Sequence, residues 1–492
     1  MTEVWIPEQQ AYCENLIGGE LAPGSGEERE IISPYTGAAL SRMRLSTAAD
    51  VDDAVQKAQV AWLGWRRTPL RERLEPLARF RAALLEELEP LSKIVAAESG
   101  KTPAEARAGV LRGIEVIEFA LSLQNSDSGG ALDVSRGVSC EYRRDALGVV
   151  VGITPFNFPA MVPLWMFPIA LSVGNTFILK PSEKVPLAAN YLGDLALRAG
   201  YPRGVFSVVH GDRVAVQALV SHPFVQAVAF VGSSQVARNV YAEAAAAGKR
   251  ALCLGGAKNQ LIVTPDADPQ LTAKAVVDSF TGCAGQRCMA GSLLLAVDEG
   301  ARLLEPIKKL AASITLGSGM GALIDRGARD RLVGAIARAE AAGVEVSLDG
   351  RQARVPAEYA DGYWLGPTIL DRVTVEHECA KEELFGPILS VIRVPTLEAA
   401  LAIERANPYG NATSVFTSSG AVARHVAERA SSGMIGVNVG VPVPREPFSF
   451  GGTKLSKFGH GDITGPSAVE FWTDLKKITS KWAAQVDATW MS

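Results

Sequence analysis

Residues 146–179 read ALGVVVGITPFNFPAMVPLWMFPIALSVGNTFIL, without one charged side chain, and they decide the fold class. The stretch exceeds the roughly 20 residues that cross a bilayer as a helix. However, the four prolines from Pro155 to Pro168 would break a helix that lipid requires to stay hydrogen-bonded. We therefore interpret the stretch as a buried strand, a loop, a short apolar helix and a second buried strand, and not as a membrane span.

Short β-branched runs continue beyond this stretch and alternate with helical segments, two of which end at Gly200 and Gly248 as C-caps. Such alternation predicts parallel βαβ units with ligands at the carboxyl ends of the strands. The candidate strands of the first series are Val149–Ile153, Thr176–Lys180, Val205–Val209 and Ala227–Val231. Those of a second series are Leu261–Val263, Leu293–Val297, Ile388–Val394 and Ala412–Phe416.

The flanking regions have other patterns. Thr47 and Asp50 form a capping-box-like start to a helix through Trp65, and helical periodicity continues to Ser122, so the N-terminal quarter is predicted to be mostly helical. Residues 138–143 and 468–482 alternate in polarity instead. Both segments are expected to be exposed strands that need a partner, which favours a homo-oligomer, a dimer or tetramer.

Composition narrows the possible partners. The 492 residues carry 49 basic and 53 acidic side chains, and 48% are hydrophobic, as in a soluble globular protein of about three structural units. The small acidic excess gives no reason to expect nucleic acid or an anionic membrane. Six cysteines and five histidines show neither disulfide nor metal spacing, and no basic residue precedes Arg29. We expect a cytoplasmic protein with small-molecule ligands and no metal.

Two segments could carry chemistry. Gly232 and Ser233 follow a strand and open a helix, where free N–H groups attract an anion, although an ordinary serine N-cap would have the same pattern. Cys288 lies in the glycine-rich segment 285–291 beside Arg287. Backbone N–H groups and this cation would lower the pKa of the thiol and make it nucleophilic, whereas the alternative is an inert buried cysteine. Gly100-Lys101-Thr102 lacks the upstream glycine of a phosphate loop.

In combination, these motifs resemble the aldehyde dehydrogenase family over essentially the whole chain. Five segments occur in the order and spacing of that family: 154–159, 179–183, 230–233, 285–288 and 383–387. The resemblance implies an α/β fold with a doubly wound NAD-binding domain (1–127 and 147–252), an α/β catalytic domain (253–445) and a small β bridging and oligomerisation element (128–146 and 446–492).

The resemblance also implies residue roles. Cys288 would be the nucleophile, and the Asn157 amide and the Cys288 backbone N–H would stabilise the oxyanion. Glu183 would disfavour the 2′-phosphate of NADP by charge repulsion. The implied NAD-binding residues are Thr154, Pro155, Phe156, Lys180, Ser182, Glu183, Gly232, Ser233, Glu383 and Phe385.

Segments 156–168, 285–289 and 433–439 are similar to the CoA-acylating branch, the methylmalonate-semialdehyde dehydrogenases. Hydrolytic members carry a water-activating Glu where this chain has Cys253. Without that base, hydrolysis of a thioacyl intermediate loses typically ~10²–10⁴-fold assistance, whereas CoA supplies its own thiolate. The alternative is that Cys253 is a core residue and another carboxylate replaces the missing base.

In this branch two arginines hold the carboxylate of the substrate, and Arg107 and Arg287 are the candidates here. Thr102 and Pro103 are predicted to open the helix that carries Arg107, which puts Arg107 on its apolar face. The alternative for Arg107 is a side chain that reaches out to solvent.

The resulting expectation is NAD-dependent oxidation of malonate or methylmalonate semialdehyde, with acyl transfer to CoA and loss of CO₂ to give acetyl-CoA or propionyl-CoA. A hydrolytic aldehyde dehydrogenase and, less favoured, a non-catalytic binding protein are the alternatives. Gln260 and segment 448–454 differ from the usual sequence of the CoA-acylating branch. A related aldehyde therefore also stays open as the substrate.

Overall fold

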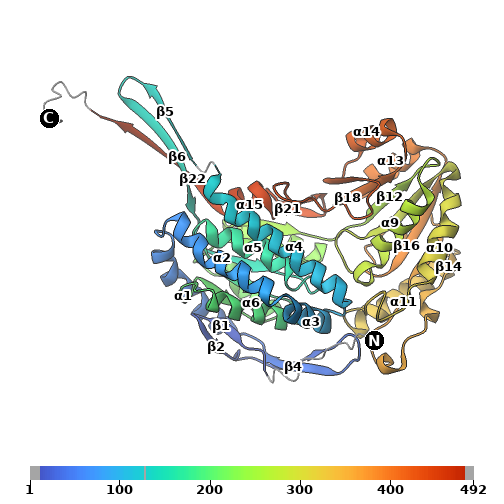
Figure 1. Cartoon of the computed structure of the whole chain (residues 1–492), viewed down its shortest axis with the longest axis horizontal. Coiled ribbons are helices and arrows are strands. Elements are labelled where there is room, and N and C mark those ends of the chain that lie inside the picture. Colours follow the sequence, from blue (N-terminus) through green and yellow to red (C-terminus); the bar gives the residue numbers. More distant parts are fainter. Residues whose placement is uncertain (1–11, 127–128, 483–492) are drawn as a thin grey trace.

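The computed structural model describes residues 12–126 and 129–482, which form two α/β units and a projecting three-stranded arm (Figure 1). The predicted strand, loop, helix and strand over residues 146–179 are confirmed. They are strand β7 (Val149–Ile153), helix α5 (Met161–Ser172) and strand β8 (Thr176–Lys180), and all three elements are buried. Within the described chain, no helix combines the length and the apolarity that crossing a membrane requires.

The first unit is built on an eight-stranded sheet whose central strands are parallel and doubly wound. From β7 the chain winds outward through β8 and β9, then returns to the other side of β7 for β10 and β11. In sheet order the strands are β2 (Glu20–Ala22), β1 (Asn15–Ile17), β9 (Phe206–Val208), β8, β7, β10 (Val225–Val231), β11 (Arg250–Leu254) and β21 (Lys457–Gly459).

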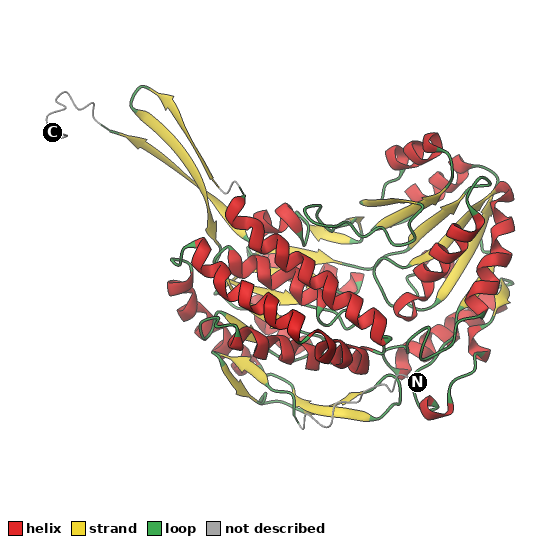
Figure 2. Ribbon diagram, in the orientation of Figure 1, coloured by secondary structure: helices red, strands yellow, loops and turns green. Residues whose placement is uncertain are grey.

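Helices pack on both faces of this sheet (Figure 2) and bury two separate apolar clusters. On one face lie α2 (Leu70–Glu86), α3 (Leu88–Ser99), α4 (Pro103–Leu121), α5 and α6 (Leu187–Arg198). On the other lie α1 (Ala48–Trp65), α7 (Arg213–Ser221) and α8 (Ser234–Ala246). The predicted capping box is present at the start of α1, with Thr47 as N-cap and Asp50 as its partner.

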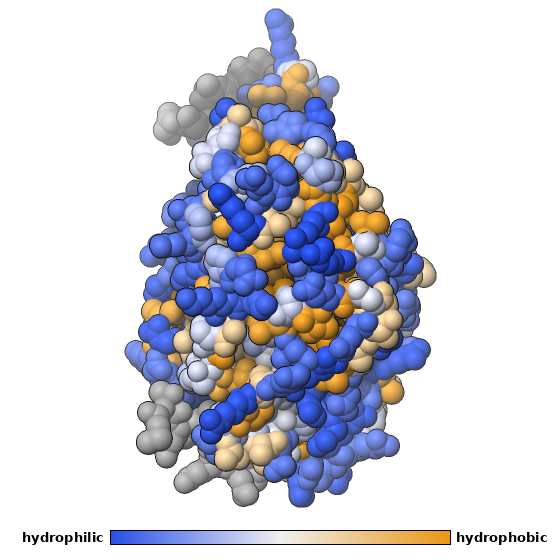
Figure 3. Space-filling view, turned by 90° about the vertical axis from the view of Figure 1, so that its right-hand side faces the viewer, coloured by the Kyte–Doolittle hydropathy of each residue, from blue (hydrophilic) through white to orange (hydrophobic). Residues whose placement is uncertain are grey.

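The second unit repeats the design with a seven-stranded sheet, in which only the edge strand β14 is antiparallel. Its strands, in order, are β14 (Glu345–Leu348), β15 (Thr368–Asp371), β16 (Ile388–Val394), β13 (Gly291–Val297), β12 (Asn259–Val263), β18 (Ala412–Phe416) and β19 (Met434–Val437). Its helices are α9 (Pro269–Thr281), α10 (Leu304–Ala312), α11 (Arg326–Ala341), α12 (Glu378–Lys381), α13 (Leu397–Ala406) and α14 (Gly420–Arg429). Figure 3 views the molecule from the right-hand side of Figure 1, where this second unit lies. The surface on that side is largely hydrophilic, with apolar groups gathered near the middle.

The arm consists of β5 (Gly129–Ser135), β6 (Val138–Ala146) and β22 (Thr473–Lys481), joined as one antiparallel sheet that extends away from the body. Leu132 and Val134 are exposed on it. The strand predicted over 468–482 is therefore partly wrong, because Gly465–Phe471 form helix α15.

The mostly helical N-terminal quarter is confirmed by helices α1 to α4, which span most of residues 48–121. Ahead of them, between residues 15 and 44, lie short strands that the sequence analysis did not predict, including β3 (Glu28–Ile32) and β4 (Ala39–Arg44). Strand β1 pairs with β9 through Leu16 and Val208, a contact between residues far apart in sequence that local periodicity cannot reveal. A short antiparallel pair of strands, β17 (Tyr409–Gly410) and β20 (Thr453–Lys454), completes the fold.

Candidate active site

Cys288 lies on a tight turn between α9 and β13. Just before it, Cys283, Ala284 and Gly285 all adopt left-handed backbone conformations, with φ of 53°, 51° and 68°. A Cβ atom added to Gly285 would lie 2.1 Å from the carbonyl oxygen of Gly386, so only glycine fits there. Surrounding contacts hold the backbone in these rarely populated conformations, as is common at functional turns. As a result, the segment at 285–288 packs directly against the segment at 383–387.

Two asparagine amides fix the backbone of Cys288 itself. The Nδ2 atoms of Asn259 and Asn411 each donate to the Cys288 carbonyl oxygen at 2.8 Å. Asn259 also bonds Ala290 O and, through its own oxygen, accepts from the N–H of Ala412. The two asparagines stand at the starts of strands β12 and β18, so the second sheet directly positions the cysteine.

Further hydrogen bonds tie the turn to helix α4 and to the first unit. The Asn157 Nδ2 atom donates to the carbonyl oxygen of Gln286 at 2.9 Å, and the Glu105 carboxylate accepts from the Cys283 N–H at 2.6 Å. The Gln286 side chain bonds the backbone of residues 322 and 324. Asn157 and Cys288 are thus brought to one place.

The protonation state of Cys288 differs from the expectation. Burial, followed by the nearby charge of Glu383, raises the pKa of the thiol to about 12, although its backbone N–H and Arg287 act in the opposite direction. The predicted lowering is therefore wrong for this structure, because the cost of desolvating a thiolate exceeds the help of one cation. The thiol is protonated at neutral pH.

The candidate cofactor residues gather at the carboxyl ends of β7 and β10, where the winding of the sheet reverses and α/β proteins bind nucleotides. Thr154 and Pro155 follow β7, and the hydroxyl of Thr154 is buried without a partner among the described residues. Gly232 follows β10, and Ser233 is the N-cap of α8, although its side chain makes no capping bond. The N–H groups of this helix start are available to an anion.

Lys180 ends β8 beside these residues. Its side chain is buried, its Nζ atom lies 3.5 Å from a carboxylate oxygen of Glu183, and burial lowers its pKa. The Ser182 hydroxyl accepts from the N–H of Lys184. A buried ammonium with a half-exposed carboxylate beside it is suited to bind the hydroxyl groups of a ribose.

Glu383 reaches the same region from the second unit. One carboxylate oxygen accepts from the Ala257 N–H at 2.9 Å, and burial raises the pKa of the group to about 7. The ring of Phe385 packs edge-on against that of Phe156, with centroids 5.9 Å apart. Residues from both units therefore enclose one region.

Cys253 is fully buried on β11 and packs in the apolar cluster on the α1, α7 and α8 face. Cys288 packs against the cluster on the opposite face. Burial raises the pKa of Cys253 to about 12. Its side chain is thus a neutral core residue with no means of activating water.

In the structure, the two arginines of the predicted clamp bond to other groups of the protein. Arg107 lies on the exposed side of α4, 48% exposed, with its Nε atom 2.8 Å from Glu89. Arg287 folds back to donate to the carbonyl oxygens of Asp278 and Ser279 at the end of α9. Sequence periodicity put Arg107 on the apolar face, but the buried face is centred on Ala106, so Arg107 falls on its flank.

The arginine of α4 that does face inward is Arg112, whose side chain is only 14% exposed. The sequence analysis missed it, together with Asn259 and Asn411. The sequence did hold a signal for two of these residues. Asn259 lies shortly after Cys253, in the segment where the chain departs from the hydrolytic members of the family. Arg112 lies two helical turns after Glu105, on the same side of α4, and Glu105 binds the Cys283 N–H. Asn411 had no signal apart from its place before a strand.

The aldehyde dehydrogenase family model matches residues 21–478. Two relatives in sequence are malonate-semialdehyde dehydrogenase 2 of Geobacillus kaustophilus, 41% identical over 95% of this chain and 98% of the relative, and malonate-semialdehyde dehydrogenase of Pseudomonas aeruginosa, 40% identical over 95% and 96%.

Two solved structures superpose with a TM-score of 0.95. One is a methylmalonate-semialdehyde dehydrogenase from Oceanimonas doudoroffii, 38% identical over 96% of this chain and 99% of that one. The other, from Sinorhizobium meliloti, was solved with NAD and is 37% identical over 97% and 99%. Matched along nearly its whole length in both sequence and fold, the chain belongs to the aldehyde dehydrogenase family.

Proposed function

We propose that the protein oxidises malonate or methylmalonate semialdehyde with NAD and transfers the acyl group from Cys288 to CoA. The observation that carries this proposal is the pairing of an intact nucleophile turn with a neutral, buried Cys253 at the position of the hydrolytic base. The names of the relatives support the aldehyde, and the NAD complex of the Sinorhizobium meliloti structure supports the cofactor.

The residues at the switch point fit NAD. The open N-terminus of α8 after Gly232 suits the pyrophosphate, and Lys180 with Glu183 suits the adenosine ribose. The unpartnered Thr154 hydroxyl is a polar atom that a ligand would satisfy, and Glu383 is the candidate for the second ribose. Glu183 favours NAD over NADP.

In the proposed mechanism, the Cys288 sulfur attacks the aldehyde carbon after losing its proton. Glu383, whose pKa of about 7 matches neutral pH and whose charge acts on the thiol, is a candidate acceptor for that proton. An amide nitrogen carries two N–H groups, so Asn157 can keep its bond to Gln286 and donate the second to the oxyanion, together with the Cys288 N–H. When NAD is bound, its nicotinamide ring accepts the hydrogen and two electrons that leave the aldehyde carbon.

The second half of the proposed reaction is a thioester exchange. The CoA thiolate attacks the thioacyl carbon on Cys288, and the cysteine thiolate leaves. Asn259 and Asn411 keep the Cys288 backbone fixed through both halves. Loss of CO₂ from the malonyl or methylmalonyl carbon skeleton gives acetyl-CoA or propionyl-CoA.

For the carboxylate of the aldehyde, we propose Arg112 in place of Arg107. Arg112 lies next to Gly113, which contacts Leu164 of α5, and one turn beyond Gly109, which faces the Phe158 ring. Phe158 directly follows Asn157 in sequence. A largely buried guanidinium at this position can pair with a carboxylate more strongly than an exposed one.

Three further expectations stay proposals. We propose the division into residues 1–127 with 147–252, 253–445, and 128–146 with 446–492, although β21 from the last range pairs in the first sheet. We also propose a cytoplasmic protein, supported by its six free cysteines, and a homo-oligomer, dimer or tetramer, supported by the unpartnered arm.

The test is NADH formation over a panel of aldehydes with and without CoA. We expect sustained turnover only with CoA, and higher kcat/KM for malonate or methylmalonate semialdehyde than for propanal. A hydrolytic enzyme, with Glu383 activating water in place of the missing base, would instead turn over steadily without CoA. No NADH formation with any aldehyde would support the non-catalytic alternative.

A further inference from the structure

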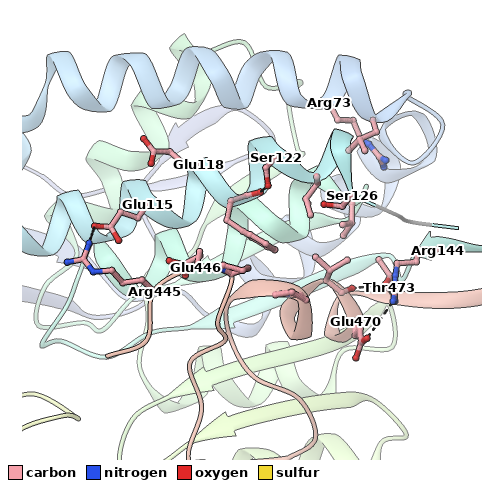
Figure 4. A pocket seen from close by; sticks show the side chains of 17 residues that line it. Arg73, Glu115, Glu118, Ser122, Ser126, Arg144, Arg445, Glu446, Glu470 and Thr473 are labelled. Atoms are coloured by element: carbon pink, nitrogen blue, oxygen red, sulfur yellow. Dashed lines mark hydrogen bonds and ion pairs between the residues drawn. The ribbon is translucent and has the colours of Figure 1, made fainter. Parts of the chain in front are cut away.

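Four charged side chains meet where helix α4 contacts the loop at 439–447. Arg112 Nη1 lies 3.1 Å from Glu446 Oε2 and also pairs with Glu115, and Arg445 Nη1 lies 2.9 Å from the other oxygen of Glu115. Figure 4 shows Glu446 and Arg445 reaching from the loop toward α4. The cluster holds two positive and two negative charges, so it is neutral overall.

The buried half of this cluster is incompletely bonded. The Glu446 side chain is 10% exposed, and its Oε1 atom has no hydrogen-bond partner among the described residues. The Nε atom of Arg112 is likewise buried and unpartnered within the described chain. A buried polar atom without a hydrogen bond lowers the stability of the fold. Since the Arg112–Glu446 pair leaves one such atom on each side chain, a ligand that bonds Arg112 more completely can replace Glu446.

The loop that carries Glu446 packs on the same apolar cluster as Cys288. Val441 and Val443 of the same loop pack against the apolar cluster that Cys288 also contacts. On the other side, Gly113 of α4 packs against Leu164, and the Trp165 ring packs at a tilt against Phe450 at a centroid distance of 4.8 Å. An aldehyde bound at Cys288 with its far end toward α4 would meet Arg112.

We propose that Glu446 is a specificity-determining residue that occupies Arg112 in the free enzyme and is displaced by the carboxylate of the substrate. The inference rests on the proposed function, because it takes the aldehyde to carry an acid group. Glu446 acts as an internal competitor: its carboxylate fills the place that the substrate carboxylate needs, which weakens the binding of acidic aldehydes and leaves that of neutral aldehydes unaffected.

The displaced side chain has room to move. Glu446 also lines a pocket of about 870 Å³ between α2, α4, α15 and the base of the arm. The same pocket carries Arg73 and Arg144, and the Nε atom of Arg73 is buried without a partner in the part of the chain that is described. A carboxylate that turns away from Arg112 thus enters a space lined by the cations Arg73 and Arg144.

The decisive variant is Glu446→Gln, which keeps the size of the side chain and removes its charge. We expect the KM for malonate semialdehyde to fall about ten-fold, the equivalent of one charge-assisted hydrogen bond, with the KM for propanal unchanged. Glu118→Gln, on the same pocket but paired with Arg81, is the matched control and should change neither value. Melting temperatures of both variants check the fold.

An unchanged or raised KM for the semialdehyde in Glu446→Gln would overturn the inference. In an Arg112→Gln background, the same change should give no gain, because the competed partner is gone. Calorimetric titration with 3-hydroxypropanoate, which has the carboxylate but no aldehyde, separates this inference from the proposed function. If the wild type fails to oxidise the semialdehyde, the proposed function is wrong. The competition by Glu446 is judged separately: tighter binding of 3-hydroxypropanoate by Glu446→Gln than by the wild type supports it, and equal binding refutes it.

Discussion

At the scale of single residues, substitutions of the neighbouring Cys283 and Cys288 test which of the two is the nucleophile. Cys283 contributes its backbone N–H to Glu105, and a change to alanine keeps that bond, whereas Cys288→Ala removes the sulfur that we propose as the nucleophile. We expect Cys288→Ala to abolish NADH formation and Cys283→Ala to retain most of it, with both variants folded by circular dichroism. Equal loss in both variants would assign the nucleophile elsewhere.

The two arginines of α4 give a second residue-scale prediction. Arg112→Ala should raise the KM for malonate semialdehyde by about one to two orders of magnitude, because a lost charge-assisted pair is worth roughly 1.5–3 kcal/mol. Arg107→Ala should leave it unchanged, since the exposed Arg107–Glu89 pair contributes little. Steady-state kinetics with propanal as the neutral reference separates the substrate carboxylate from general damage. A large effect of Arg107→Ala alone would restore the original sequence-based assignment.

At this scale, sequence reasoning was strongest where a residue type and a motif coincide. Cys288 and Asn157 were predicted, and the structure brings them together through Gln286. Arg107 was misplaced, because helical periodicity defines a face but does not reveal which neighbour covers each flank. The raised pKa of Cys288 was also missed, since burial depends on the whole fold.

Among the elements, helix α6 has an unusual cap. Its N-cap, Pro186, supplies no side-chain acceptor, and the buried carboxylate of Glu98 accepts from the N–H groups of Leu187 at 2.7 Å and Ala188 at 3.0 Å instead. Burial is the largest influence on Glu98 and raises its pKa from 4.5 to about 8. A raised carboxyl pKa means that the folded state holds this proton to higher pH than the unfolded state.

This shift predicts a pH dependence of stability. Between pH 4.5 and about 8 the unfolded chain has lost the Glu98 proton while the folded chain keeps it, so the contribution of Glu98 to the free energy of unfolding falls as pH rises and is constant above that window. We expect Glu98→Gln to unfold with a smaller loss of stability between pH 5 and pH 8 than the wild type in urea titrations. A steeper loss in the variant would contradict this assignment.

The nucleophile turn provides another element-scale prediction. Gly285 and Gly248 share a φ of 68°, but a Cβ at Gly248 meets nothing within 4 Å, whereas one at Gly285 meets the Gly386 backbone. Gly248→Ala should cost about 1–2 kcal/mol for its left-handed backbone. Gly285→Ala should cost a further 1–3 kcal/mol or so from overpacking and should lose activity. Equal unfolding free energies of the two variants would refute the close packing of the turn.

The elements themselves were largely predictable from hydrophobic patterns. All eight candidate strands occur, because each is a compact apolar run with clear ends. The missed strands β1 and β11 each pair with a strand distant in sequence, β9 and β21 respectively. Helix α15 was mistaken for a strand because its short segment also alternates in polarity.

For the whole molecule, the arm is the feature that most needs a partner. Leu132 and Val134 are 69% and 51% exposed on β5. We expect the double change Leu132→Asp and Val134→Asp to shift the protein to a smaller species in size-exclusion chromatography with light scattering, whereas Val60→Asp, on exposed α1, should not. A wild-type monomer in solution would remove the basis of the proposed oligomer.

The architecture followed from the sequence in outline, since alternating strands and helices predict doubly wound sheets. The meeting of two units at one site did not follow from composition. It needed the family resemblance, because Asn157, Cys288 and Glu383 come from segments more than 90 residues apart.

The central claim is that the thioacyl group on Cys288 waits for CoA because no base at position 253 activates water. Rapid-mixing measurement of NADH at 340 nm tests it most directly, with enzyme, NAD and malonate semialdehyde, first without and then with CoA. The account predicts a burst of about one NADH per active site without CoA, and steady turnover once CoA is added. Steady turnover without CoA, with no burst, would contradict it.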